Sequence, residues 1–239
     1  MALQPWRKGK VIKIEDTAPN TKTFWIEVSE LAIFDFIPGQ FVSLDLPIHE
    51  KPNKRLRSYS IASCPDDSNV FELLIVQAQG GAGTTYLFNE VIVGSELRLR
   101  GAQGVFILPK KIEKDIFLIC TGTGIAPFRS MVNYISLKNI PVKNIYLIFG
   151  CRKKEDLLYF AELKALEKKL PGFHYMPTLS REHWEGHFGY VHPVYEELCM
   201  TKPEASFFLC GWKHMIDEAQ KRILEMGYDR KVIHQELYG

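Results

Sequence analysis

The sequence lacks the long apolar runs that mark membrane spans and export signals. No stretch of its 239 residues approaches the roughly 20 consecutive apolar residues that a membrane-spanning helix needs. The N-terminal segment, MALQPWRKGKVIKIED, contains no apolar run of signal-peptide length either. We therefore expect a cytoplasmic protein that does not bind a membrane.

Cysteine is sparse and shows no metal-binding pattern. The five cysteines are scattered, with no CxxC pair and no iron–sulfur spacing such as CxxxxCxxC. They are expected to be reduced thiols, so any redox centre must be an organic cofactor. His183 and His187 are separated by Gly186 and loop-like residues, which argues against a helical pair of metal ligands. No metal site is expected.

Excess charge of one sign is also missing. A net charge of +2 is too small for the concentrated basic face of a nucleic-acid-binding protein. The local exception is the loop HEKPNKRLR, which holds Lys51, Lys54, Arg55 and Arg57. Because most surface charge has no partner, the first three of these cations, taken alone, indicate a solvated loop.

What is present is a globular composition, 46% hydrophobic and 24% charged, in a chain long enough for two domains. Short β-like segments run from residue 11 to about residue 100, broken by Pro, Gly, Asn or Asp. They predict an antiparallel sheet closed into a small barrel, with one short helix over residues 84–91.

After residue 110 the pattern changes to apolar strands that alternate with amphipathic helices. This alternation indicates a parallel sheet covered on both faces. The expected helices cover residues 126–137, 154–170 and 213–226. The sequence thus predicts an antiparallel β-barrel domain at 1–110 and a Rossmann-like α/β domain at 111–239.

The first strand of the second half, residues 115–120, runs directly into Thr121, Gly122, Thr123 and Gly124 and then into a helix. Glycine lets the backbone turn tightly and approach a ligand, and a helix N-terminus attracts anions. The segment predicts a site for a dinucleotide pyrophosphate. A strand-to-helix turn needs glycine in any case, so a purely structural turn is the alternative.

Several segments in this order resemble the ferredoxin–NADP reductase family. They are PGQF (38–41), RSYS (57–60), GAGT (81–84), GAQGVF (101–106), TGTGIAP (121–127), SRE (180–182), LCG (209–211) and HQELY (234–238). The resemblance covers nearly the whole chain. It implies an FAD-binding barrel followed by a nicotinamide-binding α/β domain, and therefore an FAD-dependent oxidoreductase.

By this resemblance, Arg57 would pair with the FAD pyrophosphate, for which a planar guanidinium is well suited. Tyr59 would lie against the isoalloxazine, and Ser60 would lie beside the flavin nitrogen that receives hydride. The other expected FAD contacts are Ser58, Gly83 and Thr84, the last of them as the N-cap of the short helix. Outside the motif, these residues would be an ordinary surface arginine, strand tyrosine and core serine.

The resemblance also implies the nicotinamide side of the site. Cys210, followed by Gly211, would pack against the nicotinamide without acting as a nucleophile. Glu236 would place a carboxylate at the active site, where it could pass protons. Tyr238 would cover the flavin until nicotinamide displaces it, although Gly239 follows it here. Ser60, Cys210 and Glu236 are thus the predicted catalytic residues.

NADP needs a cation for its 2′-phosphate. Ser180 and Arg181 are suitably placed after the third strand of the second half, with Arg152 as a second candidate. Tyr190 would stack on the adenine. Against this, Glu182 adds a negative charge, and WEGHFGYV (184–191) also resembles NAD-using oxygenase reductases. NADP is the favoured prediction, and NAD is the alternative.

These features predict a monomeric enzyme that moves electrons between NADP(H) and ferredoxin or flavodoxin through FAD. Lys51 and Lys54 would steer an acidic ferredoxin toward the flavin. One alternative is an NADH-dependent reductase component of an oxygenase. Another is a non-catalytic FAD-binding regulatory subunit, which would not need Ser60, Cys210 and a terminal aromatic residue together.

Overall fold

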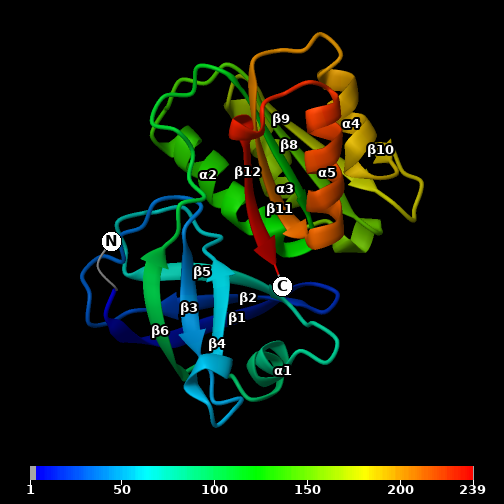
Figure 1. Ribbon diagram of the computed structural model, residues 1–239. Coiled ribbons are helices and arrows are strands. Elements are labelled where there is room, and N and C mark those ends of the chain that lie inside the picture. Colours follow the sequence, from blue (N-terminus) through cyan, green and yellow to red (C-terminus); the bar gives the residue numbers. More distant parts are fainter. Residues whose placement is uncertain (1–3, 239) are drawn as a thin grey trace. The chain divides into compact units, whose positions relative to one another are not determined.

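The computed structural model describes the backbone of residues 4–238 and the side chains of residues 4–237. By its internal contacts the chain divides into two compact units (Figure 1). The first comprises residues 1–107 and 129–134, and the second comprises residues 108–128 and 135–239. No helix within the described residues is long and apolar enough to cross a membrane.

The first unit is built on a six-stranded antiparallel sheet of order β4-β3-β6-β1-β2-β5. Its strands are β1 (Trp6–Ala18), β2 (Thr21–Glu27), β3 (Phe41–Asp45), β4 (Leu56–Ser60), β5 (Val70–Val76) and β6 (Glu96–Gln103). An antiparallel bridge between Ile61 and Leu73 joins the two outer strands. The sheet therefore curls into the predicted barrel.

The barrel interior follows from alternation along its strands. In β6, Leu97 and Leu99 are buried, whereas Glu96 and Arg98 are exposed, as expected for a strand with one solvated face. The short helix is α1 (Ala82–Asn89), which begins two residues before the predicted start at residue 84. A one-turn 3₁₀ helix, η1 (Pro52–Lys54), shapes the basic loop.

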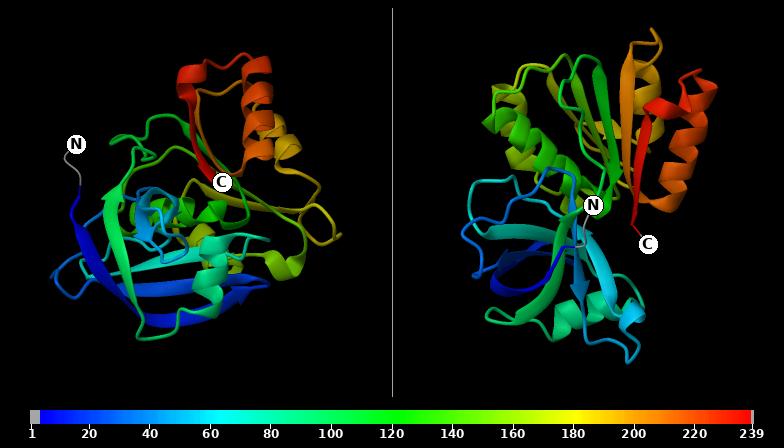
Figure 2. Two further views of the ribbon diagram at one scale, coloured as in Figure 1. Left: turned by 60° about the horizontal axis from the view of Figure 1, so that its bottom comes forward. Right: turned by 60° about the vertical axis from the view of Figure 1, so that its left-hand side comes forward.

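The second unit is built on a six-stranded parallel sheet of order β10-β9-β8-β7-β11-β12. Its strands are β7 (Asp115–Thr121), β8 (Ile145–Cys151), β9 (Phe173–Leu179), β10 (His187–Phe188), β11 (Ala205–Trp212) and β12 (Ile233–Tyr238). Every residue of β7 from Asp115 to Cys120 is buried, as expected when helices cover both faces of a parallel sheet. Figure 2 shows α2 and α3 on one face and α4 and α5 on the other.

The helices of this unit match the predictions in two cases. These are α2 (Ala126–Leu137), preceded by the 3₁₀ turn η2 (Gly122–Ile125), and α5 (Lys213–Glu225). The prediction of one helix over 154–170 was wrong. A 3₁₀ turn, η3 (Lys154–Asp156), comes first, and α3 (Phe160–Lys169) starts only after Tyr159, whose φ of 55° is left-handed. Helix α4 (Val191–Leu198) and the 3₁₀ turn η4 (Arg230–Val232) were not predicted.

Candidate functional site

Strand β4 carries the RSYS segment, residues 57–60, in antiparallel pairing with β3. Neighbouring side chains of a strand point to opposite faces, so Arg57 and Tyr59 share one face and Ser58 and Ser60 share the other. Tyr59 packs against the barrel core, and Ser60 is buried. The segment therefore presents a cation and an aromatic ring on one side and two hydroxyl groups on the other.

Arg57 lies against the first turn of α1. A Cβ atom added to Gly83 would meet Cγ of Arg57 at 2.9 Å and its Nε at 3.1 Å, so only glycine leaves room for the arginine stem. Nη1 of Arg57 donates to the carbonyls of Lys54 and Leu56 at 3.1 and 2.8 Å. Nε and Nη2 make no hydrogen bond to the described residues. A guanidinium beside the free amides of a helix N-terminus fits a pyrophosphate.

The expectation that Thr84 caps α1 was wrong. The N-cap is Gly81, and it makes no side-chain cap hydrogen bond. The Thr84 hydroxyl accepts from the backbone N–H of Ala78 at 3.1 Å and lies 3.1 Å from the carbonyl oxygen of Gly81, to which it donates. Thr84 therefore fixes the loop that precedes the helix and remains beside the first-turn amides.

Burial keeps the Tyr59 phenol protonated, and a hydrogen bond holds the Ser58 hydroxyl. Burial raises the pKa of Tyr59 to about 12, and the charge of Arg57 lowers it only in part. The phenol is therefore neutral in any ordinary assay and can donate a hydrogen bond. Oγ of Ser58 lies 3.2 Å from Oγ of Ser43, and the two hydroxyl groups share a hydrogen bond.

In the second unit, the predicted residues gather at one edge of the sheet. Because its strands are parallel, their carboxyl ends lie at the same edge, which is where open α/β sheets bind ligands. The turn 121–124 starts at the last residue of β7, Arg152 follows β8, and Ser180 follows β9. Cys210 and Glu236 lie near the ends of β11 and β12. The topology thus brings together residues that are far apart in the sequence.

The glycine turn after β7 is packed closely against the end of β11. A Cβ atom added to Gly124 would meet the backbone of Cys210, lying 2.7 Å from its carbonyl carbon, and would lie 2.8 Å from the nitrogen of Gly211. Gly122 has a φ of 55°, and a Cβ atom there would meet nothing within 4 Å. One glycine of the turn is required for close packing, whereas the other has a positive φ and faces open space.

Cys210 lies between two neighbours in the sheet. It pairs in register with Cys120 of β7 on one side and with Glu236 of β12 on the other. Cys210 is fully buried, and Glu236 is half-buried. The sheet therefore places the predicted thiol and carboxylate on adjacent strands. Tyr238 pairs through its backbone with Trp212, but its side chain lies outside the described residues.

The candidate 2′-phosphate residues are joined through their backbones. The N–H of Arg181 donates to the carbonyl of Arg152 at 2.9 Å, and Ser180 bonds to the carbonyl of Cys151 through both its N–H and its hydroxyl. Arg152 and Arg181 are exposed, and neither side chain has an ion-pair partner among the described residues. A carboxylate oxygen of Glu182 accepts from the N–H of Lys154 at 2.9 Å. Two cations without ion-pair partners among the described residues thus lie just after neighbouring strands, β8 and β9.

An aromatic segment borders this end of the sheet. Tyr190, the N-cap of α4, is 73% exposed. Before it, the rings of His183 and Phe188 stack with centroids 3.8 Å apart, and Nε1 of Trp184 donates to the carbonyl of His187 at 2.8 Å. These contacts engage the ring of His183 and the backbone carbonyl of His187. No group of three or more potential metal ligands occurs in the described part of the chain.

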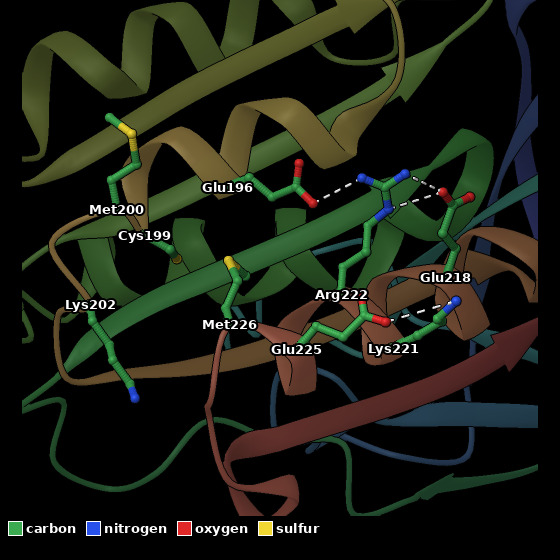
Figure 3. Close-up of a pocket in the computed structure, with 9 residues that line it drawn as sticks. All are labelled: Glu196, Cys199, Met200, Lys202, Glu218, Lys221, Arg222, Glu225 and Met226. Carbon is green, nitrogen blue, oxygen red and sulfur yellow. Dashed lines mark hydrogen bonds and ion pairs between the residues drawn. The ribbon is translucent and has the colours of Figure 1, made fainter.

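A hollow of about 650 Å³ lies elsewhere, between α4 and α5 (Figure 3). Arg222 crosses it, bonding to Glu196 at 2.9 Å and to Glu218 at 2.6 Å. The lining residues come from the last turn of α4 and the segment that follows it, and from the middle and C-terminal end of α5. Helices that follow parallel strands run back to the opposite edge of the sheet, so this hollow is at the wrong end to receive a dinucleotide.

The motifs missed one exposed residue at the ligand-binding edge, Trp212. It ends β11 two residues after Cys210, and 68% of its surface is exposed. A signal was present in the sequence, since a large aromatic residue directly after a strand and a glycine lies at the carboxyl end of that strand.

Comparison with known proteins assigns both units to families. Residues 8–107 match the oxidoreductase FAD-binding domain, and residues 118–221 match the oxidoreductase NAD-binding domain. Ferredoxin–NADP reductase B of Sorangium cellulosum (strain So ce56) is 33% identical over 240 residues, which cover 97% of both chains. The chain belongs to the ferredoxin–NADP reductase family of FAD-dependent oxidoreductases.

Other relatives show how widely this architecture is used. The phenol hydroxylase P5 protein of Acinetobacter pittii (strain PHEA-2) is 28% identical, and the match covers 97% of this chain but 65% of that protein. A ferredoxin–NADP reductase structure from Neisseria gonorrhoeae, with bound FAD and NADP, superposes with a TM-score of 0.80 at 25% identity. That match covers 97% of this chain and 98% of the other.

Proposed function

We propose that this chain transfers electrons between NADP(H) and a one-electron carrier, ferredoxin or flavodoxin, through non-covalently bound FAD. The observation that carries the choice of NADP(H) is the pair of arginines without ion-pair partners among the described residues, Arg152 and Arg181, which follow the adjacent strands β8 and β9. The Sorangium relative, which matches over 97% of both chains, is named a ferredoxin–NADP reductase. A division into an FAD domain at 1–110 and an NADP domain at 111–239 is part of this proposal.

FAD, when bound, supplies a group that accepts two electrons as hydride and passes them on singly. The chain's own residues bind and orient it. Arg57 and the first-turn amides of α1 would hold its pyrophosphate, with Gly83 and Thr84 shaping that turn. Tyr59 would supply a neutral aromatic wall.

Three further side chains would act where the nicotinamide meets the flavin. Ser60 would supply a hydroxyl hydrogen bond to the flavin. Cys210 would shape the nicotinamide surface without reacting, and Glu236 on the neighbouring strand would hold or pass a proton. Tyr238 would cover the flavin until the nicotinamide displaces it.

The preference for NADP rests on charge. A 2′-phosphate would gain charge-assisted hydrogen bonds from Arg181, supported by Arg152 and the Ser180 hydroxyl. Glu182, which would repel the phosphate, already accepts a hydrogen bond from the backbone of Lys154. The exposed ring of Tyr190 would stack on the adenine.

The basic loop supports an acidic carrier as the partner. Lys51 is the N-cap of η1 and Lys54 is its last residue, and both are exposed. Arg55 instead forms an ion pair with Asp45, with Nε 2.7 Å from Oδ1. Two exposed ammonium groups would attract an acidic ferredoxin or flavodoxin and raise its association rate at low salt. We propose that the enzyme acts as a monomer.

An oxygenase reductase role is the second candidate, because several relatives carry such names. The glycine betaine monooxygenase reductase subunit of Pseudomonas aeruginosa (strain UCBPP-PA14) is 26% identical. The match covers 99% of this chain and 66% of that protein. In this alternative NADH would be the donor, and a dedicated oxygenase would replace the diffusing carrier.

Titration of the purified protein distinguishes these candidates. We expect a flavin absorption spectrum, faster reduction by NADPH than by NADH, and electron delivery to added ferredoxin. A protein that remains colourless after reconstitution with FAD would contradict the proposal as a whole. Faster reduction by NADH would overturn only the choice of NADP and favour the oxygenase role.

A further inference from the structure

Trp212 is an exposed aromatic residue at the edge where the dinucleotide is proposed to bind. Of the four tryptophans in the sequence, it is the one with a largely exposed surface in the described structure, at 68%. A tryptophan in this state leaves a large apolar area in water, which is costly unless a partner covers it.

The backbone of Trp212 is fixed to the glycine turn. Its N–H donates to Oγ1 of Thr121 at 3.2 Å. The preceding residue, Gly211, has a φ of 129°, and a Cβ atom there would lie 2.6 Å from Oγ1 of Thr121 and 2.8 Å from its carbonyl oxygen. The end of β11 is therefore locked against the turn that is proposed to hold the pyrophosphate, and the indole projects from a rigid support.

The indole ring itself is free for a ligand. It makes no ring-stacking or cation–π contact with the side chains of residues 4–237. The next cation along the chain, Lys213, forms an ion pair with Asp217 within α5. Trp212 thus offers an uncovered flat surface and one N–H donor beside the turn.

The order of the strands indicates which half of the dinucleotide lies there. The sheet runs β9-β8-β7-β11-β12, and the pyrophosphate turn follows the middle strand, β7. Arg152 and Arg181 follow β8 and β9 on one side, so the adenosine end would lie over those strands. The nicotinamide end must then extend over β11 and β12, where Trp212 is located.

We propose that Trp212 packs against the nicotinamide mononucleotide half of bound NADP(H) and helps to position it beside Cys210. This inference rests on the proposed function, because it assumes that the carboxyl edge binds NADP(H). The indole face would cover the nicotinamide ribose, and its N–H could donate to the adjacent phosphate. Trp212 would act as a positioning residue and would not take part in the chemistry.

Calorimetry with two ligands tests this assignment. NADP⁺ contains both halves of the dinucleotide, whereas adenosine 2′,5′-bisphosphate contains only the adenosine half. We expect Trp212→Ala to weaken NADP⁺ binding about fivefold and to change the affinity for the bisphosphate less than about twofold. Met200→Ala is the control, because Met200 is 79% exposed but follows α4 at the opposite edge of the sheet.

A second variant covers the case in which Trp212→Ala does not fold. Trp212→Phe keeps a flat ring and removes the indole emission. We expect wild-type tryptophan emission to be quenched by NADP⁺ and this quenching to be largely lost in Trp212→Phe, with thermal stability retained.

Two results would overturn the assignment. One is unchanged NADP⁺ affinity in Trp212→Ala, or unchanged quenching in Trp212→Phe. The other is an equal loss for both ligands, which would mean that Trp212 acts through the fold or on the adenosine half. Wild-type protein that binds neither ligand would instead contradict the proposed function, so the two failures are distinguishable.

Discussion

The two units present their candidate ligand contacts in different ways. In the first unit they are side chains along one strand, with Arg57 and Tyr59 on one face of β4 and Ser60 on the other. In the second unit the central contacts are backbone groups of a turn, residues 121–124, at the end of a buried strand. The first site should therefore be broken by removing side-chain atoms, and the second by adding atoms to a glycine.

The largest expected effect comes from adding one methyl group to the turn of the second unit. A Cβ atom at residue 124 would collide with the backbone of Cys210 and Gly211, and backbone atoms cannot move aside as a flexible side chain can. We expect Gly124→Ala to weaken NADP⁺ binding at least about 100-fold and to lower the free energy of unfolding by about 2–3 kcal/mol. Calorimetry and denaturant titration measure the two effects.

Gly122→Ala is the matched control, because it adds the same methyl group two residues earlier. A Cβ atom there meets nothing within 4 Å, so only the positive φ of 55° opposes it. We expect a loss of stability of about 1 kcal/mol and a clearly smaller loss of NADP⁺ affinity. Equal effects of the two substitutions would show that the close approach of Gly124 to β11 is not what the turn requires.

The next effect should come from truncating a side chain in the first unit. Arg57→Ala removes the guanidinium proposed to pair with the FAD pyrophosphate, and we expect FAD binding to weaken about 30-fold. Flavin fluorescence during titration of the apoprotein measures this affinity. Arg55→Ala is the control, since Arg55 is paired with Asp45 and should change FAD affinity less than about twofold.

A similar FAD affinity in both arginine variants would remove Arg57 from the site. It would also weaken the contrast between the units, because the first site would then depend on the α1 backbone as the second depends on its turn. Arg57→Lys sharpens the test. Lysine keeps the charge but not the planar fork, so it should recover only part of the affinity.

A smaller effect is expected where the second unit does use side chains. Arg181→Ala should weaken NADP⁺ binding about tenfold and leave NAD⁺ binding nearly unchanged, because only NADP⁺ has the 2′-phosphate. Arg152→Ala should give the same selectivity with a smaller loss. Calorimetric titration with both dinucleotides checks this, and parallel losses for NAD⁺ and NADP⁺ would refute a 2′-phosphate role.

The sequence predicted those parts of the fold that depend on local pattern. The predicted start of α2 at residue 126 and of α5 at residue 213 is correct, because each helix begins shortly after a buried strand and a glycine residue. Helix α3 starts late because Tyr159 is left-handed, and tyrosine has no local preference for that conformation. Helix α4 was missed because it has only eight residues and contains Pro193, so its hydrophobic periodicity is too short to indicate a helix.

Only part of the candidate site could be predicted from the sequence. The parallel topology places residues after different strands at one edge, so motif positions such as Cys210 and Arg181 could be grouped from sequence. Individual hydrogen bonds could not be predicted. The Thr84 hydroxyl bonds to Ala78 where a helix cap was expected, and Glu182 bonds to the backbone of Lys154, because loop conformations decide which polar groups meet.

The smallest effect concerns how each unit responds to pH. In the first unit, the pKa of Tyr59 is about 12, so this phenol does not titrate in mildly acidic solution. In the second unit, burial lowers the pKa of His192 below its ordinary value, and the positive charge of Arg222 acts in the same direction. Nδ1 of His192 lies 2.9 Å from the Tyr195 hydroxyl, and Nε2 lies 3.4 Å from Glu218. The folded state thus favours the neutral imidazole.

The sign of this pH effect follows from the lowered pKa. Above the unfolded pKa both states are neutral and His192 has no effect, whereas below it the unfolded chain binds a proton that the folded chain resists. Glu218 and Glu196 also face this group and oppose the lowering of its pKa, whereas His214 adds to it. Between about pH 7 and pH 5, we therefore expect the free energy of opening α4 to fall by less than about 1 kcal/mol.

Amide hydrogen exchange, corrected for intrinsic rates, resolves the two units separately. Protection of α4 in the wild type should decrease as the pH is lowered from about 7 to 5. His192→Gln should flatten that dependence, because glutamine does not titrate. Protection of the barrel strands β1 and β2 should respond equally in both proteins. If α4 keeps the wild-type pH dependence in His192→Gln, another group on α4 or α5 carries it, and Glu218→Gln is then the variant that distinguishes carboxylate from imidazole titration.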